Sequence, residues 1–83
     1  MTALDKIKEI TEFLKGLGID DAHKESEIIV THCLGIDKTA LYRDNPVLSV
    51  KNVKDIDVVL KRRARREPLQ YIIGNVEFHG LKI

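Results

Sequence analysis

A run of basic residues between positions 61 and 66 is the densest group of chemically useful side chains in the sequence. Lys61-Arg62-Arg63 and Arg65-Arg66 flank a single alanine. Cations at this density can bind phosphate, on RNA or on a ribosome-associated partner. They also favour the C-terminal end of a helix, lay their stems over apolar surface and form salt bridges facing a protein. No aromatic residue interleaves with the run, so base stacking has no platform there. The run predicts a charged surface and leaves its partner open.

The other reactive side chains form no pattern typical of catalysis, cofactor binding or metal binding. His23, His32 and His79 lie far apart, and a metal site needs several convergent ligands. The one cysteine, Cys33, falls on an apolar face and is predicted to be a core residue. The sequence has no Gly-rich phosphate loop and no G-x-G-x-x-G motif. We therefore predict no catalytic, cofactor-binding or metal-binding residue in this chain.

Composition favours one small soluble domain. The chain has 83 residues, of which 43% are hydrophobic and 33% are charged. Its formal net charge of +1 gives no general attraction to nucleic acid or to a membrane. A single cysteine excludes an intrachain disulfide and fits a reducing compartment. The apolar runs are too short for a membrane span, and the N-terminus lacks the features of a signal peptide. We expect a cytoplasmic protein.

Helical signals divide the first 74 residues into about five segments. The expected starts are a capping box at Thr2, then Asp20 or Asp21, Asp37, Ser49 and Pro68. The expected ends are Gly16 or Gly18, Gly35, Asn45-Pro46, Glu67-Pro68 and Gly74. The longer segments carry apolar stripes at spacings of three and four: Leu4, Ile7, Ile10, Leu14 and Leu17; Ala22, Ser26, Ile29 and Cys33; Val53, Ile56, Leu60 and Ala64. The sequence predicts an all-α fold, a small bundle of about five helices.

The last residues have a different character. Val76-Glu77-Phe78 and Leu81-Lys82-Ile83 alternate apolar and polar side chains across His79-Gly80, which is typical of a β-hairpin. A hairpin this short is unstable alone, and Phe78 needs a surface to cover. We expect residues 1–74 to form the helical domain and residues 75–83 to be a hairpin connector to a further domain absent from this chain.

With these segments placed, the chain resembles the N-terminal domain of the HemK/PrmC family of release factor glutamine methyltransferases. Residues 22–35 are similar to the family's acid-Ala-Glu, aliphatic run, His and Gly pattern. Arg62-Arg63 followed by Glu67-Pro68 resembles its double arginine before a Glu-Pro pair. Residues 71–81 resemble a segment that reads Tyr/His-Leu-Thr-Gly, two variable residues, Glu-Phe-aromatic, a small residue and Leu. Order and spacing agree over essentially the whole chain.

The resemblance implies the N-terminal part of an S-adenosylmethionine-dependent protein-(glutamine-N5) methyltransferase. Such enzymes modify the glutamine of the Gly-Gly-Gln motif in class 1 peptide-chain release factors. This domain would bind and position the release factor, and the cofactor would bind the absent catalytic domain, so the fragment alone should be inactive. We expect Arg62, Arg63, Arg65 and Arg66 to be exposed and to face the partner. We expect Glu77, Phe78 and His79 to form the joint with the enzyme's own C-terminal methyltransferase domain.

The chain departs from the family pattern at several positions. Ser26 stands where the family usually has Ala, Ile73 replaces a Thr and His79 replaces a Trp. Arg66 occupies the place where a Gly commonly precedes Glu-Pro. The end of the fourth helix is therefore expected to differ from the family's.

An alternative of another class is a free-standing helical domain that binds RNA or DNA through the basic cluster 61–66. It predicts an affinity that falls steeply with salt. With a net charge of only +1, nucleic acid is the less favoured partner. A plain interaction module that docks another helix is a third option, disfavoured by the lack of an aromatic groove.

Overall fold

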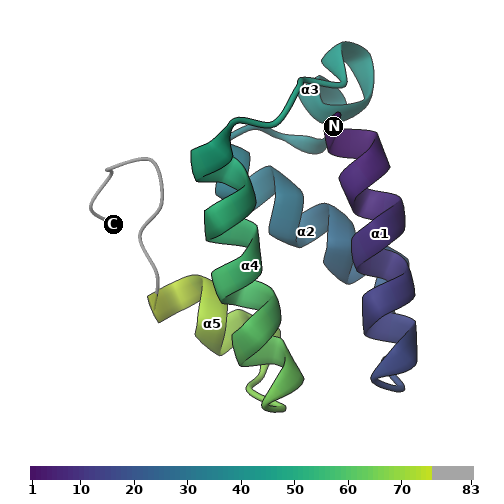
Figure 1. Cartoon of the computed structure of the whole chain (residues 1–83), viewed down its shortest axis with the longest axis vertical. Coiled ribbons are helices and arrows are strands. Elements are labelled where there is room, and N and C mark those ends of the chain that lie inside the picture. Colours follow the sequence, from purple (N-terminus) through teal and green to yellow (C-terminus); the bar gives the residue numbers. More distant parts are fainter. Residues whose placement is uncertain (76–83) are drawn as a thin grey trace.

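The structure is a computed structural model that describes residues 1–75. Five helices make up this part of the chain: α1 (Ala3–Gly16), α2 (Ala22–Leu34), α3 (Lys38–Asp44), α4 (Val50–Ala64) and α5 (Leu69–Asn75). Helix α2 packs against α1 on one side and against α4 on the other, and α5 packs against α4 and α2 (Figure 1). Within residues 1–75 the β structure is one isolated bridge, between Thr2 and Val47. The predicted all-α bundle is confirmed, and the predicted hairpin at residues 75–83 lies outside the described residues.

Capping side chains fix where three of the helices begin. The Thr2 hydroxyl accepts a hydrogen bond from the Asp5 N–H, and the Asp5 carboxylate accepts one from the Thr2 N–H, each at 3.3 Å. Ser49 forms the same kind of reciprocal box with Asn52 at the start of α4. The Asp37 carboxylate accepts from the Ala40 N–H at 2.7 Å. Asp21 occupies the N-cap position of α2, but its side chain makes no capping hydrogen bond.

Left-handed residues end several helices. Gly35 has φ +70° after α2, and its N–H donates to the carbonyls of Thr31 and His32. Asn45, with φ +40°, ends α3 before Pro46. Its side-chain oxygen also accepts from the Leu4 N–H at 3.0 Å, which ties the loop after α3 to the start of α1. Helix α5 continues to Asn75 and so passes Gly74, the residue predicted to end it.

The core is a single apolar cluster to which all five helices contribute. The predicted stripe of α1 is confirmed, since Ile7, Ile10 and Leu14 are buried and Leu4 and Leu17 pack against the cluster. The α2 stripe is also buried, including Ser26. The Ser26 hydroxyl donates to the Ala22 carbonyl at 2.7 Å and lies 2.9 Å from the Thr11 hydroxyl, so its polar atom is satisfied in the core.

The stripe of α4 differs from the predicted one at two positions. Val59 is fully buried although the predicted stripe omits it. Ala64, which the stripe includes, is exposed. The difference arises because α4 meets α2 and α5 on neighbouring faces, so its apolar surface is wider than one line of residues.

Candidate partner-binding site

Arg63, predicted to be exposed, is part of an ion pair between α4 and α2. Its Nε donates to Glu25 Oε1 at 2.9 Å and its Nη2 to Glu25 Oε2 at 3.2 Å. The two side chains are only 17% and 16% exposed. The Arg63 Nη1 also donates to the Glu67 carbonyl at 3.0 Å, so one guanidinium holds both α2 and the turn before α5. This two-pronged geometry matches the planar fork of arginine to the carboxylate.

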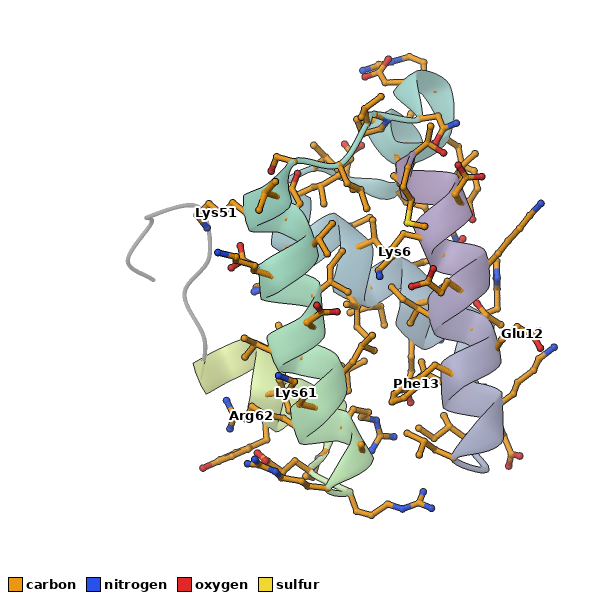
Figure 2. The ribbon with its side chains drawn as sticks, in the orientation of Figure 1. Lys6, Glu12, Phe13, Lys51, Lys61 and Arg62 are labelled. Atoms are coloured by element: carbon orange, nitrogen blue, oxygen red, sulfur yellow. The ribbon has the colours of Figure 1, made fainter. Side chains whose placement is uncertain are left out.

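Arg62 makes a second set of contacts at the same end of α4. Its Nε and Nη2 donate to Glu67 Oε1 at 3.0 and 2.8 Å. Its guanidinium carbon lies 5.7 Å from the centre of the Tyr71 ring, within the range of a cation–π contact. The hydrogen bond with Glu67 raises the pKa of Arg62. Figure 2 places Arg62 between the end of α4 and α5.

The basic cluster therefore divides into two kinds of residue. Arg62 and Arg63 are half-buried, so the prediction that they are exposed is wrong. The physical reason is that Glu25 and Glu67 neutralise them within the fold. Lys61, Arg65 and Arg66 are exposed, and within residues 1–75 their side chains have no ion pair. Contact between any of these arginines and a partner stays a prediction.

A second polar cluster, at Glu27, joins α2 to α3. The Tyr42 hydroxyl donates to the Glu27 carboxylate, and Lys38 Nζ and His23 Nε2 lie 3.4 and 3.5 Å from it. Burial opposes ionisation of Glu27, but the hydrogen bonds from Tyr42 and Lys38 outweigh it and keep its pKa below the usual value. The same hydrogen bond, together with burial, raises the pKa of Tyr42. This cluster holds α3 in place and was not predicted from the sequence.

The remaining candidates take ordinary places. Cys33 is buried as predicted, and burial raises the pKa of its thiol to about 12, so it stays protonated and unreactive at neutral pH. Among residues 1–75, no group of three or more histidine, cysteine, aspartate or glutamate side chains is placed to hold a metal ion. In the same part of the chain, every helix is too short or too polar to cross a bilayer. Glu77, Phe78 and His79 lie outside the described residues.

A groove between α1 and α4 is a feature that the sequence interpretation missed. It has a volume of about 340 Å³ and is lined by Lys6, Glu9, Ile10, Phe13, Asp57, Leu60, Lys61 and Ala64. Lys6 and Phe13 extend from α1 toward α4, and Lys61 lies on α4 (Figure 2). The sequence signal was Phe13, a large apolar residue outside the predicted stripe of α1.

The comparisons with known proteins decide the family. Residues 5–74 match the family described as the PrmC N-terminal domain. The chain belongs to this family. In this PrmC N-terminal domain the resemblance seen in the sequence is therefore confirmed over most of the chain.

Several curated relatives carry the same name. A release factor glutamine methyltransferase of Thermodesulfovibrio yellowstonii is 40% identical, over 100% of this chain and 28% of that protein. The one of Geobacter sulfurreducens is 36% identical, over 90% of this chain and 28% of that protein. The human MTRF1L release factor glutamine methyltransferase is 31% identical, over 99% of this chain and 25% of that protein. The chain thus spans about a quarter of the length of these relatives. No solved structure gives a significant match.

The departures from the family pattern acquire a structural meaning. Arg66, where the family commonly has Gly, has φ +70°, a left-handed conformation that L side chains rarely adopt. Ser26, where Ala is usual, is accommodated by its two hydrogen bonds. The alternative of a free-standing nucleic-acid-binding domain is not supported, because the relatives are methyltransferases and acids already pair with two of the arginines.

Proposed function

We propose that this PrmC N-terminal domain binds and positions a class 1 release factor for methylation of the glutamine in its Gly-Gly-Gln motif. The observation that carries the proposal is the family match over residues 5–74, together with relatives named release factor glutamine methyltransferases. The match covers only about a quarter of those relatives, so the methyl transfer itself would belong to the remainder of the longer protein. S-adenosylmethionine is the proposed methyl donor, and the cofactor would bind that remainder.

The contribution of a helical domain to such a reaction is orientation. Holding a protein substrate so that one side chain meets the catalytic centre converts a bimolecular encounter into an effectively unimolecular step. The bundle suits this role because its core and its ionic contacts fix the surface that a partner meets. The proposed location is the cytoplasm, which fits a substrate used in translation and a single buried, reduced cysteine.

The exposed arginines are the proposed contacts within the basic cluster. Arg65 and Arg66 keep their charges free of acidic partners within residues 1–75, whereas Arg62 and Arg63 serve the fold first. Charge at an exposed rim acts mainly on the association rate and on its salt dependence. We therefore expect reversal of both exposed charges to weaken release factor binding more at low salt than at high salt.

The test uses the full-length enzyme and the 83-residue chain in parallel. The full-length enzyme should transfer a tritiated methyl group from S-adenosylmethionine to a purified release factor. A release factor with the Gly-Gly-Gln glutamine replaced by alanine should accept none. The 83-residue chain should retain the release factor in a pull-down yet transfer no methyl group. No methylation by the full-length enzyme, or no retention by the chain, would overturn the proposal.

A further inference from the structure

The groove between α1 and α4 has the size and the lining of a site for one short protein segment. Its volume of about 340 Å³ lies at the lower end of the range for ligand pockets, roughly 300–1,000 Å³. Its apolar lining comes from Ile10 and Phe13 on α1 and from Leu60 and Ala64 on α4. Phe13 is 42% exposed, so a large aromatic face remains accessible within it. Aromatic side chains in such positions commonly dominate the binding energy of interfaces.

The charges around the groove favour a partner segment with an acidic side chain. Lys6 is only 6% exposed, and its ammonium lies 2.7 Å from Glu9 Oε1. An ammonium has three donors, and within residues 1–75 this is the one acceptor it meets. Lys61 lines the same groove and has no ion pair in that part of the chain. Two ammonium groups beside an apolar floor suit a carboxylate that lies next to an apolar side chain.

Asp57 adds a direction to this surface. It is exposed on the α4 side of the groove, four residues before Lys61. Its carboxylate accepts from a donor on the partner, while the two lysines donate to an acceptor. A segment with its charges reversed along its length would bring like charges together, which costs affinity. The groove therefore recognises an amphipathic segment in one orientation.

The position of the groove argues against its being covered by the enzyme's own chain. In Figure 1, α4 stands between α1 and the end of α5. The family is an N-terminal domain, so the rest of the longer relatives follows α5. That end of α5 lies on the far side of α4 from the groove. The groove faces away from the point at which the chain continues, and it stays open to another molecule.

From these observations we propose that the α1–α4 groove docks an amphipathic segment of the release factor. An apolar side chain of that segment packs on Phe13 and Leu60, and an adjacent acidic side chain binds Lys6 and Lys61. The inference rests on the proposed function, because the occupant is the substrate of that same reaction. It adds the surface and the side-chain chemistry by which that substrate is held.

Three substitutions in the full-length enzyme test the groove. Phe13→Asp places a charge on the apolar floor, Lys61→Glu reverses an exposed charge, and Lys6→Met removes the buried ammonium at similar volume. Val50→Asp is the matched control, since Val50 is an exposed apolar residue of α4 at 74% exposure and does not line the groove. The measurements are the Kd for release factor by calorimetry, the KM and kcat for methyl transfer, and the melting temperature.

Docking predicts a specific pattern across these variants. Phe13→Asp should raise Kd and KM for release factor at least tenfold, with kcat and the melting temperature close to wild type. Lys61→Glu and Lys6→Met should raise them about three- to tenfold, Lys61→Glu more at low salt. Val50→Asp should change neither value by more than about twofold. Release factor variants with single acidic residues made basic should include one that restores binding to Lys61→Glu.

Two results would overturn the groove and leave the proposed function standing. Wild-type affinity in all three groove variants would show that the release factor binds elsewhere. A lowered melting temperature or a lowered kcat at saturating release factor would show that the enzyme's own chain covers the groove. If the wild-type enzyme neither binds nor methylates release factor, the proposed function itself fails, which is a distinguishable outcome.

Discussion

Helices α1 and α2 are joined mainly by buried apolar side chains, whereas α5 is joined to the bundle by one buried isoleucine and a set of charged contacts. Ile10, Leu14 and Ile29 have no exposed surface. On α5, Ile72 is the fully buried residue, and the turn before the helix is held by Arg62 and Arg63 through Glu67. The comparison teaches that one small domain uses two means of attachment. They differ in strength, in salt dependence and in how plainly the sequence shows them.

The apolar side of the comparison should carry the largest energetic effect. Leu14→Ala in the 83-residue chain should lower the free energy of unfolding by about 2–5 kcal/mol, because it removes buried surface and leaves a cavity. That is a large share of the stability expected for this length, at roughly 0.05–0.15 kcal/mol per residue. Phe13→Ala is the neighbouring control, since Phe13 is 42% exposed. Urea denaturation measures both, and equal losses would contradict the assignment of Leu14 to the core.

The charged side should show a smaller effect with a clear coupling. Arg63→Met or Glu25→Gln should each cost about 1–3 kcal/mol, because each leaves a half-buried charged group without its partner. The double variant should lose less than the sum of the two, which isolates the pair as a double-mutant cycle. Arg65→Met, at an exposed position, should stay within about 0.5 kcal/mol of wild type. Additive losses for Arg63 and Glu25 would show that the ion pair contributes no specific attachment.

The two regions also differ in how far the sequence predicts them. The stripe of α1 and the caps at Thr2, Asp37 and Ser49 follow from local spacing, so they were predicted correctly. Arg63 and Glu25 are 38 residues apart, and no local pattern links them. The basic run was therefore interpreted as surface charge, although half of its arginines are tied into the fold.

The α1–α4 groove was missed for a similar reason. A groove is a property of two helices at once, and the sequence shows each helix alone. Phe13 lies beside the stripe of α1, and Lys61 and Ala64 belong to α4. Only the packing of both helices on α2 brings these residues to one surface. Candidate sites made by non-neighbouring helices need the fold before they can be recognised.

The Glu27 cluster combines burial with charge, and it should make stability depend on pH. An unfolded glutamate has a pKa of about 4.3, and the folded value is lower, so the unfolded chain binds more protons in the window between the two values. Stability from Glu27 is therefore complete above about pH 5 and lost as the pH falls through the folded pKa. Glu27→Gln should flatten this acid limb, by about 1 kcal/mol.

A matched control and an opposite limb check the assignment to Glu27. Glu12→Gln, whose side chain is 78% exposed, should leave the acid limb unchanged. Tyr42 has a raised pKa, so its contribution is complete below its unfolded value of about 10 and is lost as the pH rises through the folded value. Tyr42→Phe should flatten the alkaline limb. Denaturation midpoints measured from about pH 3 to 11 cover both limbs, and an acid limb unaltered in Glu27→Gln would exclude Glu27 as its source.

The smallest predicted effect lies at Arg66, in the turn on which the α5 attachment depends. Arg66 has φ +70°, and its N–H donates to the Arg63 carbonyl at 2.9 Å, which turns the chain so that Glu67 meets Arg62. A left-handed L residue costs about 1–2 kcal/mol, and glycine removes that cost while losing some entropy on folding. Arg66→Gly should therefore raise stability by about 0.5–1 kcal/mol. Arg66→Ala removes the same charge without relieving the backbone, so it should bring no gain, and equal stability of the two variants would locate the effect in the charge. Hydrogen exchange in α5 should slow in Arg66→Gly alone, because a turn that forms without strain strengthens the charged attachment and leaves the apolar core unchanged.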